Sequence, residues 1–386
     1  MRNAKEALAK ARHGARLKVL HLIEDLENGG AERVLINLAL GLDPKKFAVT
    51  VCCLTRKGRM AVELEEAGIP VHVMHKRPKV DMGLVLRLRA LMLELQIDIV
   101  HCHVFTANLW GRIAAILARV PVLITHEHSS FTIADQRRRW LEKILIRKTA
   151  RVITVSEELR QRLLVQGRLP AEKILAIHNG LEFSRRRDER RLAPLRQELG
   201  LEIFQHVIGA VGRLEYRKNY PLLLEAFAKV LEQHPRAGLL FVGAGPEAAR
   251  LRQRAHELAL TDHVVFAGYR KDITDVLGVM TVFCSSSQTE GISMAILEAM
   301  AGGLPVVATS VGGNPEILPS REYGILVPSG DAPALAQALA DTLRDPERAR
   351  RMAQHGQQRV LEHFSAERML QRVEEMYLRL SNAVRK

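Results

Sequence analysis

One segment, residues 279–318, constrains the fold more than any other part of the chain. An apolar run at 279–284 predicts a buried strand, and the spacing of apolar residues at 293–300 predicts a helix. Two glycines and a proline end that helix, and a second strand is predicted at 306–308. Strand, polar loop, helix and strand form a βαβ unit, so we expect a parallel sheet whose loops border a ligand crevice.

Two glutamates carry the chemistry of this segment. Glu290 lies in the loop before the predicted helix, and Glu298 lies in its second turn. Between them, the free N–H groups of the helix start, near Ile292, Ser293 and Met294, favour an anion without a metal ion. One carboxylate on each side of that anion suits a ligand with hydroxyl groups on both sides of a phosphate, such as a nucleotide sugar. For the two glutamates alone, solvated surface side chains are the simpler interpretation.

Length and charge limit the classes of protein to consider. The chain has 386 residues, which suits two domains, and a formal net charge of +14, which favours nucleic acid, an acidic membrane surface or a phosphorylated substrate as partner. The basic runs lack interleaved aromatic residues, which argues against nucleic acid. No apolar run reaches the roughly 18 residues of a membrane-spanning helix, and the N-terminus lacks the apolar core of a secretory signal. We therefore expect a cytoplasmic protein with reduced, buried cysteines at positions 52, 53, 102 and 284.

The first half of the chain alternates predicted strands and helices, starting with a strand at 17–23 and a helix at 31–42. Gly29 and Gly30 lie between the two, where paired glycines allow the backbone to approach a ligand closely. The simpler interpretation of the pair alone is a plain turn.

Histidines follow two further strands of this half. His101 and His103 come after a strand predicted to lead into them, and His126 and His128 end the next strand. Because the carboxyl ends of parallel strands meet at one edge of a sheet, we expect these side chains to gather there. Only Glu127 offers a further ligand at suitable spacing, so we predict no metal and expect a neutral histidine that donates to a sugar hydroxyl.

Two cations follow strands or turns of the second half. Arg213 lies in a Gly-Arg turn after a strand predicted at 206–211, and Lys218 lies at the entrance of a helix predicted at 221–232. Two cations in these places can hold a diphosphate and take the place of a divalent ion. The spacing alone is a weak signal.

The spacing of residues does not define a role for three basic segments. Residues 131–151 predict an amphipathic basic helix, for which binding to anionic lipid and ordinary packing at the surface are equally good interpretations. Residues 1–16 predict a basic surface extension. The arginine-rich run at 182–200 predicts a linker and a surface helix near a domain boundary, and its acidic residues argue against nucleic-acid binding.

The segment EGISMAILEAMAGGLPVVATSVGGNPEI resembles the signature of the retaining family 4 glycosyltransferases of GT-B fold, in which seven residues separate two glutamates. Glu290 and Glu298 match that motif, and the resemblance extends along nearly the whole chain. It implies an α/β protein with two doubly wound, Rossmann-like domains facing a cleft. The expected parts are an acceptor-side domain at 1–182, a nucleotide-sugar domain at 183–365 and a C-terminal helix at 366–386 that crosses back to the first domain.

The resemblance also implies roles for individual residues. Catalysis is assigned to Glu290, His128, Arg213 and Lys218. Donor binding is assigned to Gly29, Gly30, Arg213, Lys218, Tyr269, Arg270, Glu290, Gly291, Ile292, Ser293, Met294 and Glu298. In this scheme His128 contacts the donor sugar, with His126 as the alternative. His103 and His126 lie on the acceptor side, and the turn with Tyr269 and Arg270 holds the base.

The expected function is retaining, metal-independent hexosyl transfer from a nucleotide diphosphate sugar, without a cofactor, to a sugar or a lipid-linked acceptor. The basic surface suggests cell-envelope polysaccharide, lipopolysaccharide or glycolipid synthesis at the inner face of the cytoplasmic membrane. A nucleotide-sugar epimerase of the same fold is one alternative, but it would not be expected to show the paired glutamates. A non-enzymatic basic nucleic-acid-binding protein is another, but it would not explain Glu290, Glu298, Arg213 and Lys218 together.

Overall fold

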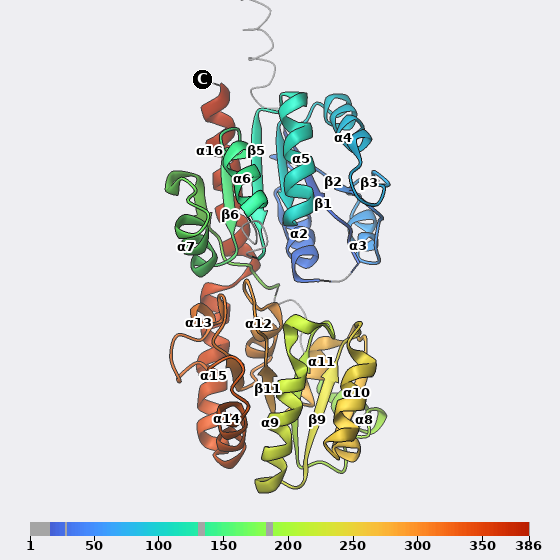
Figure 1. Cartoon of the computed structure of the whole chain (residues 1–386), viewed down its shortest axis with the longest axis vertical. Coiled ribbons are helices and arrows are strands. Elements are labelled where there is room, and N and C mark those ends of the chain that lie inside the picture. The colour runs from blue at the N-terminus through green and yellow to red at the C-terminus, as the bar shows by residue number, and fades with distance from the viewer. Residues whose placement is uncertain (1–15, 28, 130–135, 183–187, 386) are drawn as a thin grey trace, which may run out of the picture. The chain divides into compact units, whose positions relative to one another are not determined.

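The computed structural model divides into two compact units (Figure 1). Unit 1 contains the residues up to 180 together with the C-terminal segment from 366, and unit 2 contains residues 181–365. The basic N-terminal segment 1–15, the start of the predicted basic helix at 130–135 and the arginines at 185–187 lie outside the described residues. The structure describes residues 16–27, 29–129, 136–182 and 188–385.

Unit 1 is built on a seven-stranded parallel sheet with the order β3-β2-β1-β4-β5-β6-β7 (Figure 1). Its strands are β1 (Leu17–Ile23), β2 (Phe47–Cys53), β3 (Val71–Val73), β4 (Ile99–His103), β5 (Val122–Glu127), β6 (Arg151–Thr154) and β7 (Ile174–Ala176). Its described α-helices are α2 (Gly30–Gly41), α3 (Ala61–Glu66), α4 (Met82–Glu94), α5 (Val104–Ala118), α6 (Gln136–Leu145), α7 (Glu157–Val165) and α16 (Ala366–Arg385).

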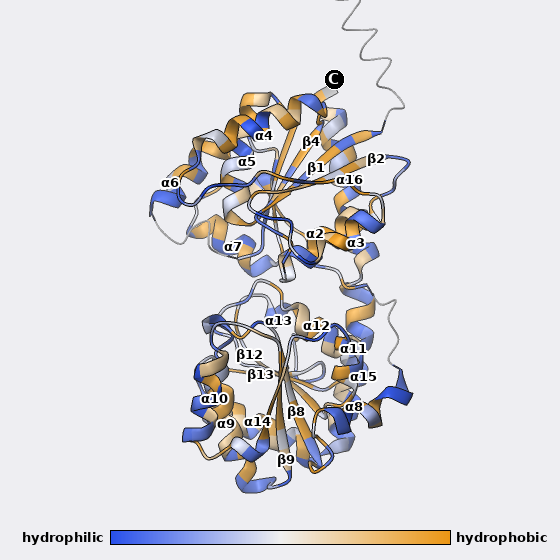
Figure 2. Ribbon diagram, turned by 90° about the vertical axis from the view of Figure 1, so that its right-hand side faces the viewer, coloured by the Kyte–Doolittle hydropathy of each residue, from blue (hydrophilic) through white to orange (hydrophobic). Residues whose placement is uncertain are grey.

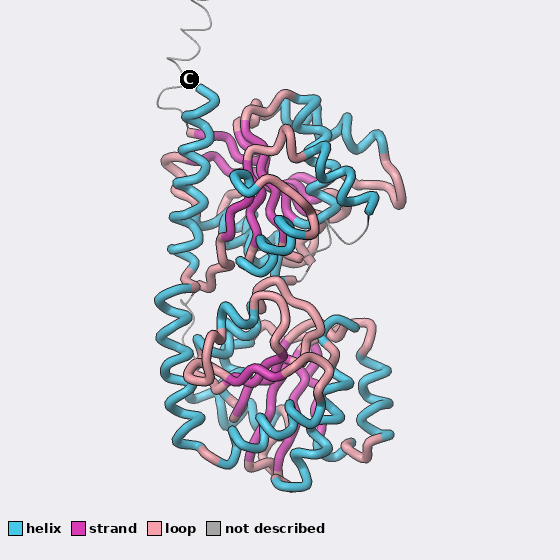
Figure 3. Tube along the Cα trace, turned by 60° about the vertical axis from the view of Figure 1, so that its left-hand side comes forward, coloured by secondary structure: helices cyan, strands magenta, loops and turns pink. Residues whose placement is uncertain are grey.

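Unit 2 is built on a six-stranded parallel sheet with the order β10-β9-β8-β11-β12-β13, and helices surround its strands (Figure 3). Its strands are β8 (His206–Val211), β9 (Ala237–Val242), β10 (Val264–Gly268), β11 (Val282–Ser285), β12 (Val306–Thr309) and β13 (Ile325–Val327). Its described α-helices are α8 (Leu192–Glu198), α9 (Tyr220–Gln233), α10 (Ala248–Glu257), α11 (Ile273–Gly278), α12 (Met294–Ala301), α13 (Asn314–Ile317), α14 (Ala332–Arg344) and α15 (Pro346–His363).

The central strands are apolar along most of their length, because helices cover both faces of each sheet (Figure 2). In unit 1, Leu20 and Leu22 of β1 pack in one core cluster, whereas Ile23 packs with Leu35 of α2 in another. All four cysteines are free and buried in these cores, as predicted. No described helix combines the length and the apolar character that crossing a bilayer requires.

Both sheets are doubly wound. The strand order reverses between β1 and β4 in unit 1 and between β8 and β11 in unit 2. This order confirms the two predicted Rossmann-like halves. Ligands bind such sheets beyond the carboxyl ends of the strands, at the point of reversal. The loops after β1 and β4, and those after β8 and β11, are therefore where a site is expected.

The segment that was predicted to organise the fold forms the βαβ unit β11–α12–β12, but its first strand begins at Val282 and not at 279. Val279 and Met280 are buried in a turn that closes α11, where their N–H groups donate to the carbonyls of Val276 and Leu277. Met280 also fills the space beside Gly209 of β8. Packing in the core thus explains two apolar residues that the sequence assigned to the strand.

The C-terminal helix α16 belongs to unit 1, where it contacts α2 and β5. Tyr377 of α16 is fully buried, lies edge-on to Phe47 and hydrogen-bonds to His101. Glu374, three residues earlier, accepts a hydrogen bond from the N–H of Asp43 at 2.9 Å. Apolar and polar contacts together hold this helix over one face of the unit 1 sheet.

Candidate functional site

Lys218 and Glu290 form an ion pair at the carboxyl edge of the unit 2 sheet. Lys218 Nζ lies 2.6 Å from Glu290 Oε1, and the two side chains are only 20% and 12% exposed. Ser287 Oγ donates to the same carboxylate oxygen at 2.6 Å. The structure therefore brings together an ammonium group and a carboxylate that the sequence assigned to one site. The two residues lie 72 positions apart.

Hydroxyl groups fix the two loops that carry this pair. Ser286 Oγ donates to the carbonyl of Lys218 at 2.9 Å, which ties the loop after β11 to the entrance of α9. Thr309 Oγ1 at the end of β12 donates to the carbonyl of Ser287 at 2.6 Å. In the sequence these serines are only part of the polar loop after the strand. Their role in positioning Lys218 and Glu290 is new information from the structure.

A glycine-rich turn after β12 supports the backbone of Glu290. The N–H of Gly313 donates to the carbonyl of Gly291 at 2.7 Å. Gly312 has a φ of +51°, and a Cβ at this position would overlap the carbonyl oxygen of Glu290. Only glycine meets both demands, the left-handed backbone and the close approach. The turn predicted at 311–314 thus holds the acidic loop in place.

Helix α12 starts directly after this loop. Ser293 is its N-cap and accepts a hydrogen bond from the N–H of Ile296. The first N–H groups of a helix have no intrahelical partner and carry partial positive charge. Ile292 is buried and Met294 half-buried, so they also anchor the helix start, and Glu298 lies half-buried one turn further along. The segment 290–298 therefore combines two carboxylates with a helix terminus, as predicted.

Arg213 lies in the turn after β8, close to the Lys218 loop. Its side chain is 64% exposed, and its Nε lies 4.0 Å from Glu215 Oε2. A Cβ on the neighbouring Gly212 would lie 3.8 Å from Lys218 Nζ, so the Gly-Arg turn passes beside the ammonium group. The same edge of the sheet thus presents one exposed guanidinium and one half-buried ammonium group.

Tyr269 and Arg270 lie in the turn after β10. The Tyr269 side chain is exposed, whereas Arg270 donates from Nε to Asp272 at 2.9 Å and also pairs with Glu198. The hydrogen bonds to Asp272 and then to Glu198 raise the pKa of Arg270 above its ordinary value. Its guanidinium is already engaged, which leaves the backbone of this turn for a ligand.

Five histidines gather at the carboxyl edge of the unit 1 sheet, four of them as predicted. His21 of β1 joins them because the strand register places it beside His101 of β4. His101 and His103 both lie in β4, which extends two residues beyond the strand end predicted at His101, and like His126 of β5 they are fully buried. His128 is half-buried and is the one of the five that solvent reaches. Neighbouring ring centroids in this histidine cluster are 4.3 to 5.6 Å apart.

The histidine cluster is neutral. Burial lowers the pKa of His21 and of His128 to about 3. Burial, followed by the neighbouring histidines, lowers the pKa of His101, His103 and His126 well below the ordinary value. His103 connects two of the rings, with Nε2 3.1 Å from His21 Nδ1 and Nδ1 3.3 Å from His128 Nε2. A neutral ring donates one hydrogen bond and accepts another, which suits both such a chain and a hydroxyl ligand.

The paired glycines of unit 1 mark the start of α2. Gly29 is the N-cap and Gly30 the first residue of the helix. A side chain on Gly29 would overlap the carboxylate of Glu32 in the first turn. The glycine thus leaves room for an acidic residue at a helix N-terminus, where a negative charge is favourable.

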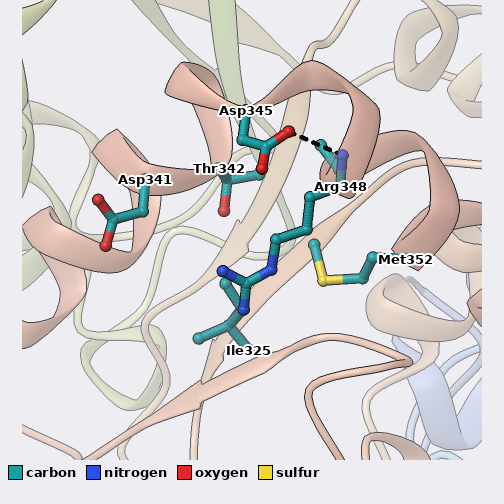
Figure 4. Close-up of a pocket in the computed structure, with 7 residues that line it drawn as sticks. Ile325, Asp341, Thr342, Asp345, Arg348 and Met352 are labelled. Atoms are coloured by element: carbon teal, nitrogen blue, oxygen red, sulfur yellow. Dashed lines mark hydrogen bonds between the residues drawn. The ribbon is translucent and has the colours of Figure 1, made fainter.

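A small pocket elsewhere in unit 2 lies among β13, α14 and α15 (Figure 4). Its polar groups serve the local fold, because Asp345 caps α15 by accepting a hydrogen bond from the N–H of Arg348 at 3.0 Å. No predicted site residue lines this pocket. The carboxyl edges of the two sheets are therefore the better candidates for a functional site.

Two family models match this chain, one in each half. The family model "Glycosyltransferase Family 4" matches residues 28–185, and "Glycosyl transferases group 1" matches residues 194–359. An Escherichia coli UDP-Gal:alpha-D-GlcNAc-diphosphoundecaprenol alpha-1,3-galactosyltransferase is 26% identical over 309 residues, which are 77% of this chain and 79% of that protein. A Bacillus anthracis N-acetyl-alpha-D-glucosaminyl L-malate synthase is 26% identical over 326 residues, 82% of this chain and 84% of that protein.

The fold matches solved structures over nearly its whole length. The crystal structure of Anabaena Alr3699/HepE in complex with UDP and glucose superimposes with a TM-score of 0.83 and 25% sequence identity. The match covers 94% of this chain and 99% of that one. The same Anabaena protein has also been crystallised with UDP-glucose.

Proposed function

The chain belongs to the glycosyltransferases of family 4 and group 1, and we propose that it moves a hexose from a nucleotide diphosphate sugar to an acceptor in cell-envelope glycan synthesis. The observation that carries the proposal is the Lys218–Glu290 pair beside the start of α12. An ammonium group and helix N–H groups suit a diphosphate, and carboxylates suit the hydroxyls of sugar and ribose.

In the proposed mechanism the cations take the charge that develops on the leaving group. As the bond between the anomeric carbon and the phosphate oxygen breaks, its electrons pass to the nucleoside diphosphate. Lys218, Arg213 and the first N–H groups of α12 would stabilise that charge without reorganising. They would replace a divalent ion, so we propose that transfer needs no metal.

The two glutamates would bind hydroxyl groups rather than form a covalent intermediate. Glu298 would bind the ribose and Glu290 the sugar near the reacting carbon. A glycosidase places two carboxylates on either side of the scissile bond, whereas here a helix start separates them along the chain. We propose retention of the anomeric configuration, which NMR of the product's anomeric proton would test.

In unit 1 we propose that Gly29, Gly30 and His128 serve the donor's phosphate and sugar, with a neutral His128 ring bonding a hydroxyl. His103 and His126 are fully buried, so they would act on the acceptor side through His128 and not by direct contact. The acceptor class is a sugar or a lipid-linked sugar. The two relatives named above differ in this respect, since one name includes L-malate and the other a diphosphoundecaprenol.

Helix α6 supports a further part of the proposal, contact with an anionic membrane surface. Trp140 and Ile144 are 62% and 44% exposed, and Arg137 and Lys143 are exposed on the same helix. Exposed aromatic and aliphatic residues among cations are typical of helices that lie on anionic lipid. Flotation with anionic vesicles at low salt should carry the protein upward, and a Trp140→Ser variant should float less. Equal flotation of both proteins, or flotation of neither, would contradict membrane contact through α6.

The test of the function is transfer itself. We expect nucleoside diphosphate to be released from one of the UDP-, GDP- or ADP-sugars, in EDTA, when a sugar-lipid acceptor is added. An epimerase would convert the donor without releasing the nucleotide, and a nucleic-acid-binding protein would leave it unchanged. No release with any donor and acceptor would contradict the proposal.

A further inference from the structure

Three histidines of unit 1 meet under helix α16. His21 lies opposite His101 in the register of β1 and β4, and His103 is two residues further along β4, on the same face. Their ring centroids are 5.1, 5.3 and 4.3 Å apart, and all three residues are completely buried. One ring nitrogen from each can be chosen so that the three atoms lie within 4.8 Å of one another.

Two nitrogens of this triad have no partner. His21 Nε2 and His101 Nε2 are buried and make no hydrogen bond within the part of the chain that the structure describes. A buried polar atom without a partner is rare and costs free energy, so such an atom needs a bound water or ion as its partner. Two of them in one cluster of imidazoles point to a group that binds lone pairs.

The second ring nitrogen of His101, Nδ1, faces helix α16. His101 Nδ1 lies 2.5 Å from the hydroxyl of Tyr377 on α16. In metal sites a ligating histidine almost always bonds an outer partner with its second nitrogen, which fixes the ring and leaves the first nitrogen for the ion. Tyr377 provides that partner and leaves Nε2 of His101 for a ligand.

We propose that His21, His101 and His103 bind a divalent transition-metal ion such as Zn²⁺. Imidazole suits Zn²⁺, Cu²⁺ and Ni²⁺, and three histidines are a known zinc ligand set. With Zn–N distances of about 2.0–2.1 Å, the nitrogens around one ion are roughly 3.4 Å apart, so the rings need small movements only. The fourth position is open to water.

The sequence predicted no metal because Glu127 alone offers a further ligand at suitable spacing, and His21 was not considered. The triad is favoured over His103, His126 and His128, the second group within reach of one ion, because the Tyr377 hydroxyl orients the His101 ring of the triad from outside. The site does not depend on the proposed transfer activity, whose diphosphate clamp lies in unit 2. Its role would be to tie β1 and β4 together beneath α16.

The experiment uses the full chain, stripped with a chelator and then titrated with Co²⁺ as a spectroscopic probe. A histidine site of low coordination number gives visible d–d absorption, and we expect one Co²⁺ per chain that Zn²⁺ displaces. Zn²⁺ at 100 times its Kd should raise the free energy of unfolding by about 2.7 kcal/mol. Absence of visible absorption, with no effect of Zn²⁺ on thermal unfolding, would overturn the proposal.

Variants locate the ion. His21→Leu should abolish Co²⁺ binding, and Tyr377→Phe, which keeps the ring and removes only the outer hydroxyl, should weaken it about 10- to 100-fold. The matched control is His126→Leu, a buried histidine of the same cluster outside the triad, which should still bind Co²⁺. If His21→Leu does not fold, the Tyr377→Phe result decides. Loss of binding in His126→Leu but not in His21→Leu or Tyr377→Phe would overturn the assignment.

Discussion

The carboxyl edges of the two sheets have the same topology but different chemistry. In unit 1 the strands end in five neutral imidazoles, packed ring against ring under α16. In unit 2 they end in ions, with Lys218 and Glu290 paired and Arg213 exposed nearby. The doubly wound fold provides the place in both units, and the side chains decide whether that place suits an uncharged ligand or an anion.

The units also differ in where they put buried charge. Unit 1 does bury an ion pair, Arg112 with Glu142, but the pair joins α5 to α6 and both side chains are 3% exposed. Arg112 also donates from Nε to the carbonyl of Asn108 at 2.7 Å. The buried pair of unit 1 is thus part of the packing, whereas the Lys218–Glu290 pair of unit 2 lies at the sheet edge where we propose that the donor binds. The predictions below test this difference.

The largest expected effect is on the stability of unit 1. Arg112→Met should lower the free energy of unfolding by about 3–5 kcal/mol, because it leaves the Glu142 carboxylate buried without its partner. Denaturant unfolding measures this. The double variant Arg112→Met, Glu142→Leu should recover most of the loss, since apolar residues replace both charges. A double variant as unstable as the single one would show that the pair itself stabilises the fold.

Lys218→Met should act on activity instead. Removal of one group that stabilises a developing negative charge costs about 100- to 1,000-fold in rate, or about 2.7–4 kcal/mol. The initial rate of nucleoside diphosphate release measures it, and the unfolding midpoint should change less than in Arg112→Met. Lys229→Met, which removes an exposed lysine of α9, is the matched control. If Lys218→Met lowered the rate of nucleoside diphosphate release less than ten-fold, the distinction between structural charge in unit 1 and functional charge in unit 2 would be wrong.

Gly312→Ala should disturb the acidic loop of unit 2. The new Cβ would meet the carbonyl of Glu290 in a left-handed backbone, so we expect about 1–3 kcal/mol of lost stability together with lower transfer activity. Gly330→Ala is the control, since Gly330 has a φ of +85° with nothing within 4 Å of the added carbon. Gly330→Ala therefore measures the cost of the left-handed backbone without a steric contact. Equal effects of the two variants would show that the contact with Glu290 is unimportant.

The last prediction concerns how the free energy of unfolding of unit 1 depends on pH, measured on chelator-stripped protein. His21 and His128 have a folded pKa of about 3, lowered by burial, against roughly 6.5 when unfolded. The unfolded chain therefore binds more protons between these values. Their contribution to stability is complete above about pH 6.5 and is lost as the pH falls toward 3. Hydrogen exchange should show β4 and β5 loosening on acidification before β8 and β11; the reverse order would contradict a neutral histidine cluster.

Much of this architecture could be predicted from the sequence, because its signals are local. The alternation of apolar strands, glycine-rich turns and amphipathic helices gave both doubly wound sheets, and the Glu290–Glu298 spacing located the loop and helix of unit 2. The family resemblance assigned Lys218 and Glu290 to one site, in the segments after β8 and β11 that flank the switch point, but their ion pair was not predicted.

The parts that could not be predicted depend on register and on distant segments. His21 lies in an ordinary strand, and only its register with β4 brings it to His101. Tyr377 meets His101 from 276 positions away, and no local pattern pairs this residue of the C-terminal helix with β4. Ser286, Ser287 and Thr309 gave no signal beyond polarity, yet their hydroxyls hold the acidic loop. Hydrogen bonds between loops can be identified only when the arrangement of the strands is known.

The central claim is that the charged edge of unit 2 holds a nucleotide diphosphate sugar without a metal ion. The most direct test is thermal unfolding in EDTA with UDP-, GDP- and ADP-sugars, for the wild-type chain and for Lys218→Met. The account predicts a rise in Tm with one class of nucleotide sugar, equivalent to about 2.7 kcal/mol at 100 times the Kd, and its loss in the variant. A rise that appears only when Mg²⁺ or Mn²⁺ is added, or that Lys218→Met leaves intact, would contradict it.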